Sequence, residues 1–226
     1  KNKNLIISFY KNEERAIIYK SYLDNLKIKM INLSKEKNIF SKKINGLTGC
    51  LTIIDTRINN LSIEGSNFNC EDTLNFIRSE GQIKNINIKN SISDGLDADF
   101  SNLNIDNLFV QEANNDCSDF SYGKYDIKFS EFINCGDKAA SVGEKSKMKL
   151  GDVTVLNSNT GIASKDSSKT EINNSSITGV KECFAAYNKK QEFSGGSISI
   201  NNSSCKNFNN KKFKDKYSSI EIKNEF

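Results

Sequence analysis

The stretch IKNINIKNSISDGLDADF, from Ile83 to Phe100, contains two short runs in which apolar and polar side chains alternate. Alternation with a period of two is typical of a β-strand that has one face in a core and the other toward solvent. The two runs are separated by asparagine, serine, aspartate and glycine, which favour turns. The stretch therefore predicts two strands joined by a turn.

The first run is one copy of a signature, apolar-x-x-apolar-x-apolar, that recurs along the chain. Successive copies end in steps of 35, 25, 22, 22, 23, 22, 23 and 22, at Ile28, Ile63, Ile88, Val110, Phe132, Val155, Ile177, Ile200 and Ile222. A second column keeps a constant step of 22, at Leu74, Leu96, Ser118, Ala140, Ile162 and Phe184. Such a period is typical of a solenoid, in which each turn buries its apolar face only against its neighbours.

Two kinds of solenoid have repeats of about this length. A leucine-rich repeat has one strand per repeat and is dominated by leucine, whereas here two segments alternate and isoleucine and valine prevail. The repeats IKNINIKNSISDGLDADF and TEINNSSITGV resemble the right-handed parallel β-helix of the pectin-lyase-like superfamily, over roughly Leu51 to Ile222. We therefore expect an all-β fold, a right-handed single-stranded parallel β-helix of about eight to nine coils with about 22 residues per coil.

The beginning of the chain departs from this period. Residues 1–45 are expected to form an irregular N-terminal segment, either a cap or a linker from a preceding domain, and residues 46–226 the β-helix domain. The run EERAIIYKSYL, residues 13–23, is expected to form a short helix. Because the last signature strand ends at Ile222 with no polar cap after it, we expect the chain to be part of a larger chain or assembly.

The composition excludes several classes of function. Histidine is absent, so no mechanism can use an imidazole. The net charge is +4 with acids and bases interspersed, which does not indicate a nucleic-acid partner. No apolar stretch is long enough for a membrane span. The six cysteines do not follow a zinc pattern, and we expect Cys183 and Cys205, which are one period apart, to stack as buried thiols in preference to a disulfide.

The stretch from Ser93 to Ser101 is unusually acidic for a strand. In the 22-residue register, Asp97 and Asp119 lie one turn apart with Asp99 beside them, so like charges would stack and repel. The patch is either a solvated face or a site in which a proton, a cation or a substrate offsets the repulsion. We expect no cofactor, with Ca²⁺ at the acidic patch as the one alternative.

The resemblance implies a polysaccharide partner, because carbohydrate-active members of the superfamily bind an extended glycan in a groove on one sheet. A pair of carboxyl groups about 5–9 Å apart can hydrolyse a glycosidic bond, whereas a uronate lyase or epimerase needs a base and a charge neutraliser. The candidate catalytic residues are Asp97, Asp99, Asp119, Lys165 and Tyr187. The candidate substrate-binding residues are Asp94, Asp116, Lys138, Glu144, Asp166, Lys189 and Lys190.

The resemblance does not extend to a catalytic motif. The Gly-His-Gly segment of polygalacturonase-like members cannot be completed without histidine. The alternative to a lyase, epimerase or hydrolase is a non-catalytic glycan-binding, adhesive or structural β-helix of a larger surface or phage tailspike protein. Either kind of protein is expected outside the cell or at its surface. The insertion NKKQEFSGG, residues 188–196, is either a tolerated surface loop or a lid.

Overall fold

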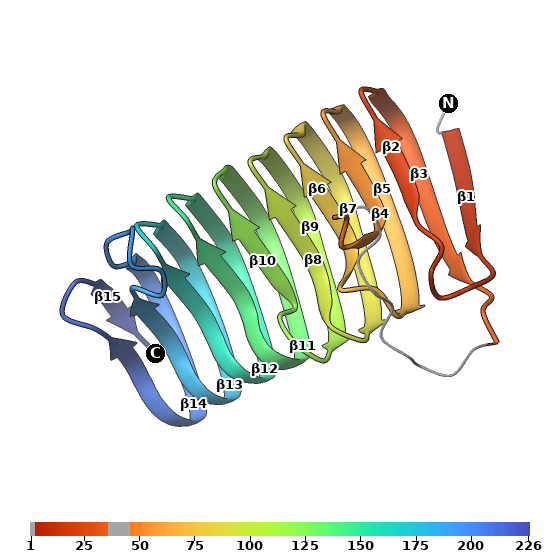
Figure 1. Cartoon of the computed structure of the whole chain (residues 1–226). Helices are drawn as coiled ribbons and strands as arrows, with labels where there is room; N and C mark the ends of the chain where they lie inside the picture. Colours follow the sequence, from red (N-terminus) through yellow and green to blue (C-terminus); the bar gives the residue numbers. More distant parts are fainter. Residues whose placement is uncertain (1–2, 36–45) are drawn as a thin grey trace.

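The computed structural model describes residues 3–35 and 46–226, which form an all-β parallel solenoid of about ten turns with about 22 residues per turn (Figure 1). The strands are β1 (Lys3–Phe9), β2 (Ala16–Tyr19), β3 (Tyr22–Asn32), β4 (Gly49–Ile54), β5 (Arg57–Phe68), β6 (Asp72–Ile77), β7 (Glu80–Ser91), β8 (Asp94–Asp99), β9 (Asn102–Ala113), β10 (Ser118–Ser121), β11 (Lys124–Gly143), β12 (Lys147–Lys165), β13 (Lys169–Tyr187), β14 (Ser197–Lys214) and β15 (Ser219–Glu225). The described residues include no helix that is long and apolar enough to cross a membrane.

The strands stack in two rows, which we call the long row and the short row. The long row runs β1-β3-β5-β7-β9-β11 and continues through β12, β13, β14 and β15. The short row runs β2-β4-β6-β8-β10 and continues in the C-terminal halves of β11 to β14, which pass through both rows without a break. Its register pairs Leu74, Leu96, Ser118, Ala140, Ile162 and Phe184 on successive turns. The predicted parallel β-helix with a period of 22 is confirmed, while its right-handedness and its exact number of coils stay predictions.

The N-terminal part of the chain joins the same stack. Strands β1 and β3 pair with each other, β3 also pairs with β5, and β2 pairs with β4. The short helix expected over residues 13–23 is therefore wrong, because this run supplies β2 and the start of β3. The expected division at residue 45 lies at the edge of residues 36–45, outside the described residues, and it stays a prediction.

Two steps of the predicted register are also wrong, the one from Ile63 to Ile88 and the one from Ile177 to Ile200. Ile63 lies beside Ile86, so the true step there is 23, and Ile88 lies beside Gly65 instead. The run IKNINI carries two inward isoleucines, and the sequence pattern alone does not say which of them is the equivalent of Ile63. The step of 25 therefore makes this coil two residues too long, and Ile200 lies beside Ile172 and not beside Ile177.

The interior is one continuous apolar core built from the inward positions of both rows. Its largest fully buried side chains include Phe76, Phe120, Phe132 and Phe184. The buried Tyr125 packs against Phe120 with ring centroids 4.8 Å apart, and its hydroxyl donates to the carbonyl of Ala98 at 2.8 Å. A buried hydroxyl without a partner would oppose folding, so this bond makes a tyrosine compatible with the core.

Asparagine occupies a sharp bend that recurs within the long strands. Asn67, Asn90, Asn134 and Asn157 lie at this bend on different coils, and all have positive φ angles, from 55° to 64°. Asparagine tolerates this left-handed conformation better than most residues. Neighbouring amides also bond to each other, as between Asn90 Nδ2 and Asn67 Oδ1 at 2.8 Å. The asparagines therefore close the coils and link each coil to the next.

All six cysteines form disulfides, Cys50–Cys70, Cys117–Cys135 and Cys183–Cys205, so the expected thiol stack is wrong. Their sequence separations of 20, 18 and 22 residues mean that each bridge closes about one turn of the solenoid. Cys205 is not the equivalent of Cys183 on the next turn, because it lies in register beside Ile177. The insertion before β14 causes this shift and brings Cys205 within reach of Cys183.

Candidate functional site

The acidic stretch lies on the outward face of the short row. There, one side chain from each successive turn lines up along the solenoid axis, and we call this line the outer column. It consists of Thr52, Asn75, Asp97, Asp119, Ser141, Ala163 and Ala185. All members of the outer column except the two aspartates are buried, although they face away from the core. Neighbouring side chains therefore cover this face.

Three aspartates at the middle of this face form what we call the acidic cluster, Asp97, Asp99 and Asp119. Asp97 lies beside Asp119 in register, and Asp99 lies beside Ser121. Asn75 Nδ2 donates to Asp97 Oδ2 at 2.8 Å. The structure thus places on one surface the three carboxylates that the 22-residue period aligns, and it adds the amide of Asn75, which is not among the predicted site residues.

The buried side chain of Lys165 enters the cluster from two coils away. Lys165 is 4% exposed, and its Nζ lies 3.6 Å from Asp119 Oδ2. The lysine reaches this position by lying across Gly143, where a Cβ would be 3.4 Å from Lys165 Cε. Because Gly143 has no side chain, the turn between the two residues leaves a path for the lysine.

Burial and mutual repulsion change the acidity of the cluster. The pKa of Asp97 is raised well above its usual value by burial and by the charges of Asp72, Asp99 and Asp119. Burial, and then the charge of Asp119, also raises the pKa of Asp99, while burial raises that of the neighbouring Asp72 to about 6. The cluster therefore retains protons at a pH where a solvated aspartate is ionised.

The candidate binding residues Asp94, Asp116 and Lys138 form the border of the cluster and hold the main chain. Asp94 Oδ1 accepts the backbone N–H of Asp116 at 2.9 Å, and Asp116 Oδ1 accepts that of Lys138 at 2.9 Å. Lys138 Nζ lies 3.4 Å from Asp116 Oδ1 and also contacts Asp137. These side chains link successive turns, and burial followed by the charge of Asp116 raises the pKa of Asp94 to about 7.

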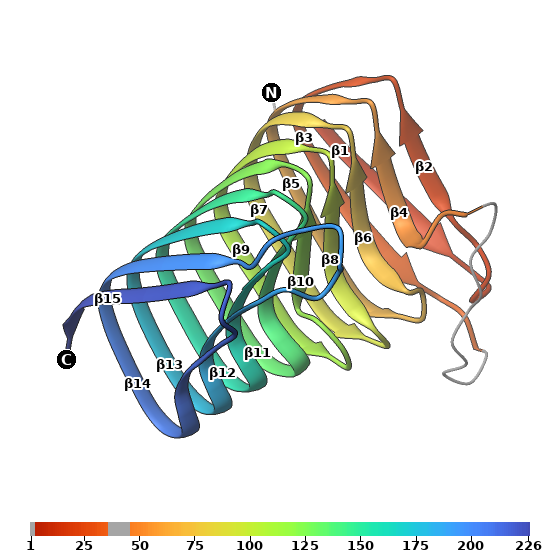
Figure 2. The same cartoon turned by 60° about the vertical axis from the view of Figure 1, so that its left-hand side comes forward.

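The insertion forms a loop, residues 188–196, that folds back along the axis toward the cluster. The step from Ile172 to Ile200 is 28, against 22 from Leu150 to Ile172. Asp166 Oδ1 accepts the backbone N–H groups of Lys189 and Lys190 at 2.7 and 2.8 Å. Figure 2 shows this loop, in blue, extending back over the short row.

The loop reaches the turns that border the cluster. Lys190 Nζ forms an ion pair with Glu144, whose other carboxylate oxygen accepts from Ser121 Oγ at 2.5 Å. The half-buried Tyr187, just before the loop, lies beside Lys165 in register. Lys165, Glu144 and Lys190 therefore lie near the acidic cluster, whereas Asp166 and Lys189 anchor the loop.

Aromatic side chains at the turns beside the cluster were missed by the sequence reasoning. The rings of Phe100 and Tyr122 are stacked, with centroids 4.6 Å apart and planes at 5°. The ring of Phe193, in the loop, lies edge-on to the ring of Tyr122, with the two centroids 6.1 Å apart. The signal was available, because Phe100 and Tyr122 are one period apart and each directly follows a residue of the column that contains Asp99 and Ser121.

The two aromatic turn residues are also conformationally strained. Phe100 and Tyr122 both have a φ of 52°. The equivalent residue also has a positive φ on neighbouring coils, at Asp55 (50°) and Arg78 (47°), so this conformation belongs to the bend of the solenoid and does not mark a function. Phe100 is 53% exposed, so its bulky ring adds strain at this bend without gaining burial in the core.

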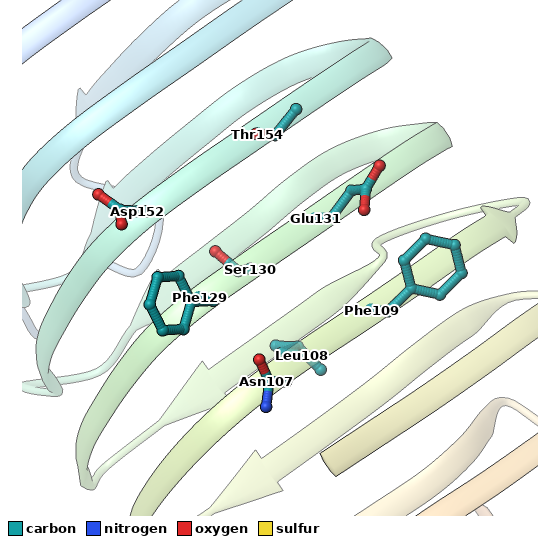
Figure 3. A pocket seen from close by; sticks show the side chains of 8 residues that line it. All are labelled: Asn107, Leu108, Phe109, Phe129, Ser130, Glu131, Asp152 and Thr154. Carbon is teal, nitrogen blue, oxygen red and sulfur yellow. The ribbon is translucent and has the colours of Figure 1, made fainter. Parts of the chain in front are cut away.

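Two surface concavities lie away from the acidic cluster. Figure 3 shows one of about 260 Å³ on the outward face of the long row, where Phe109 and Phe129 stand near Glu131 and Asp152. A larger one of about 620 Å³ lies around Lys124 and Lys147. The carboxylate of Asp152 is exposed and already accepts from Asn174 Nδ2 at 2.6 Å. We favour the acidic cluster as the site because its polar groups are buried and its carboxyls are perturbed.

The cluster does not form a ready metal site. Within the described residues, no three or more carboxylate or cysteine side chains are grouped in a way that would hold a metal ion, and Ca²⁺ stays a prediction. The site is thus defined by its carboxyls, one buried lysine and the aromatic turns. Comparison of the chain with protein-family models, curated proteins and solved structures gives no match.

Proposed function

We propose that the chain is a polysaccharide-binding β-helix, related in type to the pectin-lyase-like superfamily, and that the glycan lies along the outer column. The observation that carries this proposal is a line of buried polar atoms without a hydrogen-bond partner: Thr52 Oγ1, Asn75 Oδ1, Asp119 Oδ1 and Ser141 Oγ. Buried polar atoms are normally paired. Sugar hydroxyls can both donate and accept, so an extended glycan offers partners at the spacing of the turns.

A ligand gains access to these atoms when long side chains move aside. Lys165 crosses Gly143 on its way to Asp119, over the turn that carries Ser141. A change of lysine rotamer would uncover this part of the column without altering the solenoid. The stacked Phe100 and Tyr122 at the border add apolar surface of the kind that packs against the C–H face of a sugar ring.

Among the reactions considered, hydrolysis of a glycosidic bond fits the cluster best. Asp97 has a raised pKa and suits a general acid, whereas Asp119 is paired with Lys165 and suits the partner carboxylate. One turn separates them, about 4.8 Å in a parallel stack, which is close to the carboxyl spacing of about 5 Å in retaining enzymes. A uronate, as required by lyases and epimerases, would meet three aspartates, so a neutral or cationic glycan is favoured.

The disulfides support a location outside the cell. Three bridges that use all six cysteines are characteristic of oxidising compartments, and disulfides are rare in the cytosol. Extracellular polysaccharides are accessible there. We therefore propose a secreted or surface-exposed location.

The double variant Asp97→Asn with Asp119→Asn tests the proposal. Release of reducing ends from a glycan that the wild type hydrolyses should fall about 10²–10⁴-fold, as expected when general acid–base catalysis is removed. The matched control is Asp126→Asn with Glu131→Gln, which removes two exposed carboxylates on the outward face of β11. Unchanged turnover in a folded double variant would contradict hydrolysis at the cluster. Binding without any turnover by the wild type would instead favour the non-catalytic alternative.

Replacing both aromatic turn residues, Phe100→Asn with Tyr122→Asn, should weaken glycan binding about tenfold, or about 1.4 kcal/mol. The stability should change little, because relief of the positive-φ strain offsets the lost ring stacking. Calorimetric titration with glycan and urea unfolding measure the two effects. Phe129→Asn is the control, since Phe129 is also 53% exposed but lies on the long row. A loss of stability with unchanged affinity would show that the aromatic pair is structural.

A further inference from the structure

The position of the Lys165 ammonium shows what kind of group the acidic cluster accommodates. Lys165 is an outward residue of β12, yet its side chain is buried and its Nζ lies next to Asp119. At 3.6 Å this contact is longer than a normal hydrogen bond. The lysine therefore supplies charge to the cluster without satisfying the carboxylate that it approaches.

The groups around this ammonium remain short of partners. Asp119 Oδ1 is buried and unpaired, and so is the hydroxyl of Ser141, which lies on the next turn and is 0% exposed. Asn75 donates to Asp97 through Nδ2, but its own Oδ1 is unpaired and the residue is only 1% exposed. Unpaired, fully buried side chains on both sides of the aspartates indicate a polar ligand that the chain does not itself supply.

We infer that the acidic cluster binds the ammonium group of an amino sugar, at the position that Lys165 Nζ fills in this structure. This inference rests on the proposed function, and it names the class of glycan. An ammonium carries three donors, and the unpaired Asp119 Oδ1 and Ser141 Oγ on adjacent coils can accept two of them. The neighbouring hydroxyls of the sugar would then pair with the remaining atoms of the outer column.

An amino sugar fits the cluster better than a metal ion or an acidic sugar. Within the part of the chain that the structure describes, the carboxylates are not grouped as metal ligands, whereas a single positive charge is already accommodated. An acidic sugar would bring a further negative charge beside Asp97, Asp99 and Asp119. Lys165 thus acts as an internal competitor, which a cationic glycan displaces.

The test compares a glucosamine oligosaccharide with the same oligosaccharide after acetylation of every amine, by calorimetric titration at low salt. The two probes have the same backbone and differ in charge. The wild type should bind the amine form at least about tenfold more tightly, and this preference should decrease as salt is added. Lys165→Met should increase the affinity for the amine form severalfold and leave that for the acetylated form unchanged. Asp119→Asn should abolish the preference.

The outcomes separate this inference from the proposed function. Equal binding of the two probes by the wild type and by Lys165→Met would overturn the inference while leaving the polysaccharide-binding proposal intact. Failure of the folded wild type to bind any glycan, including neutral ones, would remove the proposed function itself. Loss of the amine preference in the presence of millimolar Ca²⁺ at constant ionic strength would show a metal site and also overturn the inference. Should Lys165→Met fail to fold, the wild type and Asp119→Asn decide the question.

Discussion

Replacing Cys117 and Cys135 together by alanine is expected to lower the free energy of unfolding by about 3 kcal/mol, as for a bridge that closes a loop of about 18 residues. Loss of the bridge gives the unfolded chain more conformations, while the folded state changes little. Alanine fits both sites: Ala139 is fully buried in the column of Cys117, one turn on, and Ala113 is buried beside Cys135. Urea unfolding under oxidising conditions measures the difference.

Removal of all three bridges should have a much larger effect. If the contributions were additive, the loss would be about 9 kcal/mol, which is comparable with the whole stability of a typical domain. In a solenoid each turn contacts only its neighbours, so bridges at both ends and in the middle stabilise different parts of the stack. The control is unfolding in the presence of a reductant, where wild type and the Cys117/Cys135 variant should differ little. Equal stability of the two under oxidising conditions would contradict a structural role for this bridge.

The sequence was sufficient to predict the solenoid because several independent sets of positions recur with the same period of 22 residues. Inward positions such as Leu74, Leu96 and Ala140 recur at whole multiples of the period, and they are all buried in the register that the structure adopts. Strand β3 carries the signature copy that ends at Ile28, but β2 was missed for a physical reason. In β2 the exposed residues Ile17 and Tyr19 are as apolar as their inward neighbours, so the alternation of a strand is hidden.

The site could be predicted only in part. The alignment of Asp97, Asp99 and Asp119 follows directly from the period, because residues one period apart lie on neighbouring turns. The approach of Lys165 does not follow, since it depends on a side chain that crosses a whole turn at Gly143. The disulfide partners were equally hidden. They join different positions within one turn, whereas the periodic pattern relates equivalent positions on different turns.

Asp94→Asn is expected to stabilise the protein at pH 8 by up to about 4 kcal/mol and to have little effect at pH 4. The pKa of Asp94 is raised to about 7 by burial and then by the charge of Asp116. The folded state therefore holds this proton more tightly than the unfolded state. The stability that comes from binding this proton is fully present below about pH 4 and is lost as the pH rises through about 7. Each unit by which the folded-state pKa exceeds the unfolded-state pKa corresponds to 1.36 kcal/mol. Urea unfolding from pH 4 to pH 8 measures the change.

The substitution isolates the charge because both hydrogen bonds to Asp94 involve one oxygen. Asp94 Oδ1 accepts from Asn115 Nδ2 at 2.7 Å and from the backbone N–H of Asp116 at 2.9 Å, and the amide oxygen of an asparagine can accept both. The variant should therefore keep the link between the two turns while removing a buried negative charge. Asp126→Asn, at an exposed position on β11, should leave the pH dependence unchanged. If Asp94→Asn instead destabilises the protein equally at pH 4 and pH 8, the carboxylate acts only as a turn-holding acceptor, and its burial imposes no electrostatic cost.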